Sequence, residues 1–140
     1  LSFIGQLESV PPKLKASMER AMHDSRGNTG LSLQVAINYG SRLEIVNAVQ
    51  KIARLVQEGK LSPEQVDENL ISSQLYTGGM PDPELLIRTG GEQRLSNYLL
   101  WQSAYTEIFV TPTLWPEFTP ECFDQAIEEF SRRHRRWGGD

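Results

Sequence analysis

The sequence predicts an α/β fold with a mainly parallel sheet and helices on both of its faces. Short apolar runs that stop near glycine or proline alternate with longer amphipathic runs along the whole chain. The segments between successive apolar runs are long enough for helical crossovers, which favours parallel strands. The 140 residues, of which 39% are hydrophobic and 23% charged, are typical of one soluble globular domain spanning 1–140.

The first half of the chain predicts two strands and three helices. Leu1 to Ile4 form a short apolar strand, and two prolines then open a helix that ends near residue 27. Residues 31–37 alternate apolar and polar side chains, as a half-buried strand does. Residues 43–56 carry a helical apolar stripe, and the capping sequence at 62–65 opens a short helix.

The second half predicts two further strands, each followed by a helix. Residues 84–87 and 108–110 are short apolar runs typical of strands. A helix is expected from 97 to 106, and another begins after the capping residue Thr119. The inner face of this last helix is expected to contain Phe123, Ala126, Ile127 and Phe130.

Composition excludes several classes of function. A formal net charge of −4 argues against a general nucleic-acid binder, which usually carries a basic excess. Cys122 is the only cysteine, so the chain can form neither an intrachain disulfide nor a thiolate zinc cluster. No apolar run approaches the ~20 residues that cross a bilayer, and no signal peptide is visible. These features predict a cytoplasmic protein.

One strand end has the residue types of an anion site. Arg88 ends the third predicted strand, and Arg94 and Ser96 follow two glycines in the turn before the helix expected at Asn97. A helix N-terminus offers unpaired N–H groups, and guanidinium groups bind phosphate oxygens in a planar fork. Ser96 adds a hydroxyl donor. The pattern indicates a site for an anion with several oxygens, such as a diphosphate.

Each of these residues also has a simpler interpretation. The arginines could be surface residues that flank a turn and pair with Glu84 or Glu92. Glu107, expected to close the next helix, could hold magnesium against a diphosphate or could be a solvated helix-end carboxylate. Asn38 and Arg42 would reach the same edge of the sheet or would form only a polar turn.

The stretch from Pro81 to Phe118 resembles the signature region of the cis-prenyltransferases, specifically the bacterial undecaprenyl diphosphate synthases. The resemblance lies in the ordered strings IRTGGE, RLSN, LLWQSAYTE and LWPEF. The segments LSFIG, GNTGLSLQVAINYGSR and RRHRRWGG also look like parts of this family, so the resemblance covers nearly the whole chain.

The resemblance implies an enzyme that condenses isopentenyl diphosphate onto an allylic diphosphate such as farnesyl diphosphate, with Mg2+ as its cofactor. The product would be undecaprenyl diphosphate, the lipid carrier for cell-wall polymers. The enzyme would be a cytoplasmic homodimer, peripheral at the membrane where its lipid product resides.

The resemblance also assigns roles to residues. Arg88, Arg94 and Ser96 would bind isopentenyl diphosphate, and Glu107 would be a magnesium ligand, in its own site or in the partner subunit's site. The stretch from Arg136 to Gly138 resembles a family ending that reaches across the dimer.

The family's N-terminal loop with the catalytic aspartate has no counterpart in this sequence. The resemblance therefore implies a C-terminal portion, without a catalytic residue and inactive alone. Two alternatives stay open: a non-catalytic partner subunit of a heteromeric prenyltransferase, or an unrelated phosphate-binding α/β module.

Overall fold

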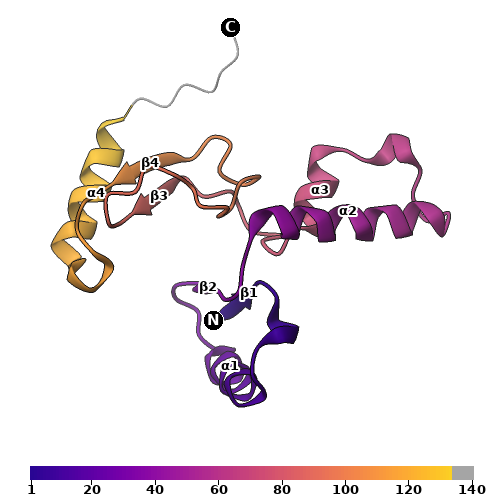
Figure 1. The fold of residues 1–140 in the computed structure, drawn as a ribbon, viewed down its shortest axis with the longest axis horizontal. Helices are drawn as coiled ribbons and strands as arrows, with labels where there is room; N and C mark the ends of the chain where they lie inside the picture. The colour runs from indigo at the N-terminus through magenta and orange to yellow at the C-terminus, as the bar shows by residue number, and fades with distance from the viewer. Residues whose placement is uncertain (134–140) are drawn as a thin grey trace, which may run out of the picture. The chain divides into compact units, whose positions relative to one another are not determined.

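A computed structural model describes residues 1–133 of the chain. The chain divides into two compact units, Leu1–Met80 and Pro81–Asp140, and each contains one pair of parallel strands (Figure 1). The α/β class and the parallel direction of the strands predicted from sequence are confirmed. Within residues 1–133, no helix is both long enough and apolar enough to cross a membrane.

The first unit contains one strand pair and three helices. Its elements are β1 (Ser2–Ile4), η1 (Leu7–Ser9), α1 (Pro12–Ser25), β2 (Gln34–Ala36), α2 (Ser41–Gln57), η2 (Pro63–Gln65) and α3 (Glu68–Gln74). The predicted capping sequence is present, because the Gln65 side chain accepts a hydrogen bond from the Ser62 amide at 2.8 Å. It opens only a 3₁₀ turn, and Asp67 caps α3 separately by accepting from the Leu70 amide.

The buried stripe of α2 is polar at its start. Ser41, Glu44, Ala48 and Ile52 are buried along one face, whereas Val46 and Val49 of the predicted apolar stripe are exposed. Glu44 stays buried because its carboxylate accepts hydrogen bonds from the Tyr39 hydroxyl and the Tyr76 amide. A buried carboxylate is tolerated only with such partners, so Glu44 joins α2 to Tyr39 before it and to Tyr76 after α3.

The second unit contains β3 (Leu85–Arg88), β4 (Glu107–Val110), η3 (Trp115–Glu117) and α4 (Pro120–Arg132). β3 and β4 pair in parallel, with Leu86 opposite Ile108 and Arg88 opposite Val110. Because side chains alternate between the two faces of a sheet, these four lie on the same face. The strand pair therefore presents three apolar side chains and one guanidinium group on one surface.

The helix expected from 97 to 106 is wrong, since this segment forms a series of turns. Ser96, Asn97 and Leu99 have φ angles of 48°, 62° and 46°, in the left-handed region that a right-handed helix excludes. Serine and asparagine bond readily to nearby groups outside a helix. Here the Ser96 hydroxyl accepts a hydrogen bond from the Arg88 guanidinium, which ties the start of the segment to the end of β3.

Two smaller expectations also differ from the structure. The strand predicted at 31–37 is only three residues long, and Leu31 is 90% exposed. Trp115 is exposed and stacks on Phe118 with ring centroids 6.1 Å apart. On the predicted inner face of α4, Ala126 is buried but Phe123 and Ile127 are exposed.

Candidate functional site

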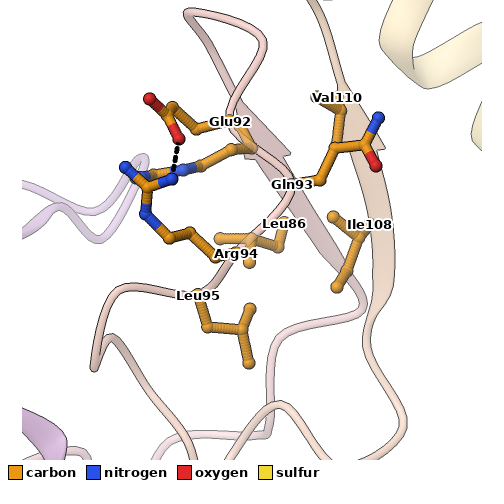
Figure 2. A pocket seen from close by; sticks show the side chains of 8 residues that line it. Leu86, Glu92, Gln93, Arg94, Leu95, Ile108 and Val110 are labelled. Atoms are coloured by element: carbon orange, nitrogen blue, oxygen red, sulfur yellow. Dashed lines mark ion pairs between the residues drawn. The ribbon is translucent and has the colours of Figure 1, made fainter.

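A cavity of about 180 Å³ lies between the strand pair of the second unit and the loop that follows β3 (Figure 2). Its lining residues are Leu86, Arg88, Glu92, Gln93, Arg94, Leu95, Ile108 and Val110. The strands supply three of the apolar side chains and the loop supplies the fourth, Leu95. Both guanidinium groups and the carboxylate come from the end of β3 and the loop. The cavity thus has an apolar wall and a charged side, which suits a ligand with an anionic head and a short hydrocarbon.

Arg88 is the last residue of β3, and its guanidinium is only partly hydrogen-bonded. Its Nη2 donates to the Ser96 hydroxyl at 3.1 Å. Its Nε is buried and has no hydrogen-bond partner among the residues that the structure describes. A buried donor without an acceptor is costly, so an anion that entered the cavity and accepted from this Nε would remove an unfavourable feature.

Arg94 forms an ion pair with Glu92 across the opening of the loop, where the two side chains point toward each other in Figure 2. The side chain of Arg94 is 68% exposed and that of Glu92 is 43% exposed. Pairs this accessible to water contribute little stability. Glu92 was one of the two carboxylates that the sequence offered as partners for these arginines, and it lies in the cavity itself.

The glycine turn holds this loop against the segment after β4. The Gly90 amide donates to the Thr113 carbonyl at 2.9 Å, and the Gly91 amide donates to the Thr111 carbonyl at 2.8 Å. Both glycines have positive φ, 79° and 73°, which residues with a Cβ rarely adopt. The turn therefore needs its glycines for backbone conformation, as the sequence predicted.

The site lacks the helix N-terminus that the sequence led us to expect. The residues after Ser96 form turns, so no helix of the described chain begins at this cavity. Ser96 does not line the cavity and contacts it through Arg88. Binding of an anion here would depend on the two guanidinium groups, and Ser96 would orient one of them.

Glu107 lies away from this group of residues. It is the first residue of β4, not the last residue of a helix, and it pairs with Leu85 at the start of β3. Its carboxylate accepts from Arg133 at 2.8 Å, and Arg133 also pairs with Glu129 at 2.6 Å. These two acidic partners, Glu129 first, raise the pKa of Arg133 above its ordinary value.

The remaining candidates fall elsewhere. Asn38 has a φ of 47° and donates to the Ser9 hydroxyl at 2.8 Å, as a polar turn residue would. Arg42 is the second residue of α2. Both belong to the first unit, whereas the cavity belongs to the second. Arg136 and Gly138, predicted to reach across a dimer, lie outside the described residues.

The apolar wall of the cavity is the part that sequence reasoning missed. Leu86, Ile108 and Val110 were interpreted only as strand residues. Their positions carried a usable signal, because Leu86 is two residues before Arg88 and so faces the same side. Ile108 and Val110 are also two residues apart and so share a face of β4. Only the register of the two strands shows that this is the face that carries Leu86 and Arg88.

Comparisons with known proteins agree with one another. A family model described as "Putative undecaprenyl diphosphate synthase" matches residues 1–138. The isoprenyl transferase of Heliobacterium mobile is 55% identical over 136 residues, which cover 97% of this chain and 52% of that protein. The isoprenyl transferase of Porphyromonas gingivalis is 47% identical over 135 residues, which cover 96% of this chain and 53% of that protein.

Two solved structures are also similar. The lavandulyl diphosphate synthase of Lavandula x intermedia, in complex with dimethylallyl diphosphate, gives a TM-score of 0.95 at 38% identity over 99% of this chain and 59% of that one. A probable undecaprenyl diphosphate synthase from Campylobacter jejuni gives 0.81 at 33% identity over 98% of this chain and 62% of that one. The chain spans about half the length of the curated relatives that it matches.

Proposed function

The chain belongs to the undecaprenyl diphosphate synthase family, and we propose that it provides the isopentenyl diphosphate site of a cis-prenyltransferase. The observation that carries this proposal is the single cavity lined by both Arg88 and Arg94, with the Arg88 Nε buried and lacking an acceptor. Family membership over residues 1–138 excludes the alternative of an unrelated phosphate-binding module.

The proposed reaction joins isopentenyl diphosphate to an allylic diphosphate of the farnesyl type. The π electrons of the isopentenyl double bond form a bond to C1 of the allylic chain. The allylic C1–O bond breaks, diphosphate leaves, and a proton is lost from the isopentenyl unit. Repetition would give undecaprenyl diphosphate, a lipid carrier. The similar lavandulyl enzyme, solved with dimethylallyl diphosphate, supports prenyl diphosphates as the substrate class.

In this reaction the described residues would bind and orient. Arg88 and Arg94 would hold the isopentenyl diphosphate head group, and Ser96 would fix the direction of the Arg88 guanidinium. The apolar wall formed by Leu86 and Ile108 would hold the hydrocarbon. Fixing both ends of a small substrate sets the position of its double bond, which lowers the entropic part of the barrier.

We assign no catalytic acid, base or nucleophile to this chain. Its residues supply a binding site for one of the two substrates, and the allylic diphosphate needs a site of its own. We therefore expect the 140 residues alone to bind isopentenyl diphosphate without turning it over. A non-catalytic partner subunit remains the alternative, and it would differ by failing to bind isopentenyl diphosphate at this cavity.

The proposal includes Mg2+ as the cofactor, with Glu107 as one of its ligands. The carboxylate fits as one ligand, because within residues 1–133 only its Oε2 accepts a hydrogen bond, from Arg133. Mg2+ usually takes one or two carboxylates together with phosphate oxygens. It does not make a whole site, since the described residues hold no cluster of three His, Cys, Asp or Glu. When bound, Mg2+ would neutralise diphosphate charge.

A homodimer would explain how Glu107 can hold magnesium although it lies away from Arg88. Glu107 and Arg88 lie at opposite ends of a strand pair, so Glu107 would serve a site completed by another chain. The proposal also places the enzyme in the cytoplasm or at the membrane surface, where its substrates and its lipid product meet.

Binding of isopentenyl diphosphate to the 140-residue chain, measured by isothermal titration calorimetry, tests the proposal. Arg88→Ala should weaken binding about 10- to 150-fold, the equivalent of the ~1.5–3 kcal/mol of a charged hydrogen bond. Arg94→Ala should have a smaller effect, because Arg94 is mostly exposed and already pairs with Glu92.

Arg132→Ala is the matched control. Arg132 is also an exposed arginine of the second unit with a glutamate partner, Glu128, and it does not line the cavity. The affinity of this variant should equal that of the unchanged chain. If Arg88→Ala binds isopentenyl diphosphate as tightly as Arg132→Ala does, the site is elsewhere and the proposed function fails.

A further inference from the structure

Glu92 places a negative charge inside a cavity that is assigned to an anion. Its carboxylate and the guanidinium groups of Arg88 and Arg94 are the charged groups of the lining. The three leave the cavity with a net charge of +1, where the two arginines alone would give +2. Figure 2 shows the Glu92 carboxylate directed at the Arg94 guanidinium along the marked ion pair.

The backbone keeps Glu92 in this place. The residue before it, Gly91, is anchored by its amide to the Thr111 carbonyl at 2.8 Å. Arg94 follows only two residues later, so the partners share one short loop. The ion pair therefore forms within this loop, whose backbone is held by the bond to Thr111.

We infer that Glu92 is a positioning residue that sets the affinity of the cavity by occupying Arg94 until a diphosphate displaces it. The inference rests on the proposed function, since it concerns the same cavity. The ion pair uses the Nη1 of Arg94, and a phosphate oxygen that binds this nitrogen competes with the Glu92 carboxylate for it. Because both side chains are substantially exposed, the pair is weak and the exchange is accessible at equilibrium.

This competition has a defined size and sign. Breaking an exposed ion pair changes an equilibrium by a factor of up to about five. Glu92 therefore lowers the affinity for diphosphate by about two- to five-fold. If Glu92 instead supported the loop or bound the ligand, its presence would raise this affinity.

The test uses inorganic diphosphate and the 140-residue chain in isothermal titration calorimetry. Glu92→Gln should bind diphosphate about two- to five-fold more tightly than the unchanged chain. Asp124→Asn is the control for net charge, because Asp124 is an exposed carboxylate of α4 outside the cavity. Its affinity should be unchanged. An equal gain in both variants would show a general charge effect and would overturn the inference.

A double variant tests whether Glu92 acts through Arg94. In an Arg94→Ala background, Glu92→Gln should no longer increase affinity, while the melting temperature of each variant stays within a few degrees of its parent. Weaker binding by Glu92→Gln, or the same gain without Arg94, would overturn the inference. Binding by the unchanged chain with no gain in Glu92→Gln would reject this inference alone, whereas no binding by the unchanged chain would reject the proposed function with it.

Discussion

Replacement of Arg88 by methionine should separate binding from stability in one substitution. Arg88 lies at the end of β3, with its Nε buried and lacking a partner and its Nη2 bonded to the Ser96 hydroxyl. Methionine has a similar length and no polar hydrogen. It removes the buried unpaired donor together with the bond to Ser96, which is made near solvent.

In the chain without ligand, the two changes have opposite effects on the free energy of unfolding and nearly cancel. A buried unpaired donor costs about 1–3 kcal/mol, and a hydrogen bond from a charged group contributes about 1.5–3 kcal/mol, less where it is exposed to solvent. Arg88→Met should therefore leave the free energy of unfolding unchanged or raise it by about 1 kcal/mol. The same variant should lose about 10-fold or more in affinity for diphosphate, because a charged donor that contacts the ligand is gone.

Urea unfolding followed by tryptophan fluorescence measures the stability term, since all three tryptophans fall in Pro81–Asp140 and so report on the second unit. Arg94→Met is the matched control, because Arg94 is mostly exposed and its removal should leave stability unchanged. If Arg88→Met lowers the free energy of unfolding by 2 kcal/mol or more, Arg88 is a structural residue and its unpaired Nε is no indication of a ligand.

Two further predictions concern the rest of the chain. Glu44→Ala should destabilise the first unit by about 2–6 kcal/mol, because the buried carboxylate accepts from both Tyr39 and Tyr76; faster hydrogen exchange throughout α2 would show it, and unchanged protection would contradict it. Hydrogen bonds from Thr119, first from its backbone and then from its side chain, lower the pKa of Cys122. The thiolate thus persists to lower pH, and Thr119→Val should move the midpoint of iodoacetamide alkylation to higher pH; an unmoved midpoint would refute this role.

The parts predicted well from sequence are those fixed by local chemistry. The turn at Gly90 and Gly91 was identified from residue type, because few residues other than glycine adopt its backbone angles. α4 was placed within a residue of its observed start by the Thr119–Pro120 signal. The two arginines were assigned to one strand end, and both line the same cavity.

The parts predicted poorly depend on contacts between distant residues. The segment after Ser96 was predicted to be a helix, yet Asn97 and Leu99 take left-handed angles. One of them, Leu99, has no local reason for this conformation and would ordinarily cost about 1–2 kcal/mol to hold there. Contacts such as the Thr106 hydroxyl to the Pro83 carbonyl, 23 positions away, are not visible in a periodicity.

The parallel register gives the strongest argument that one chain does not form a whole site. Glu107 is opposite Leu85 and Val110 is opposite Arg88, so three residues, or about 10 Å of strand, separate the backbone of Glu107 from the level of the Arg88 backbone. Arg133 further holds Glu107 toward the end of α4. A magnesium ion bound by a diphosphate at Arg88 would have to reach across this length to contact the carboxylate of the same chain. Under the proposed function, Glu107 would instead serve the site of a second copy, which avoids this separation.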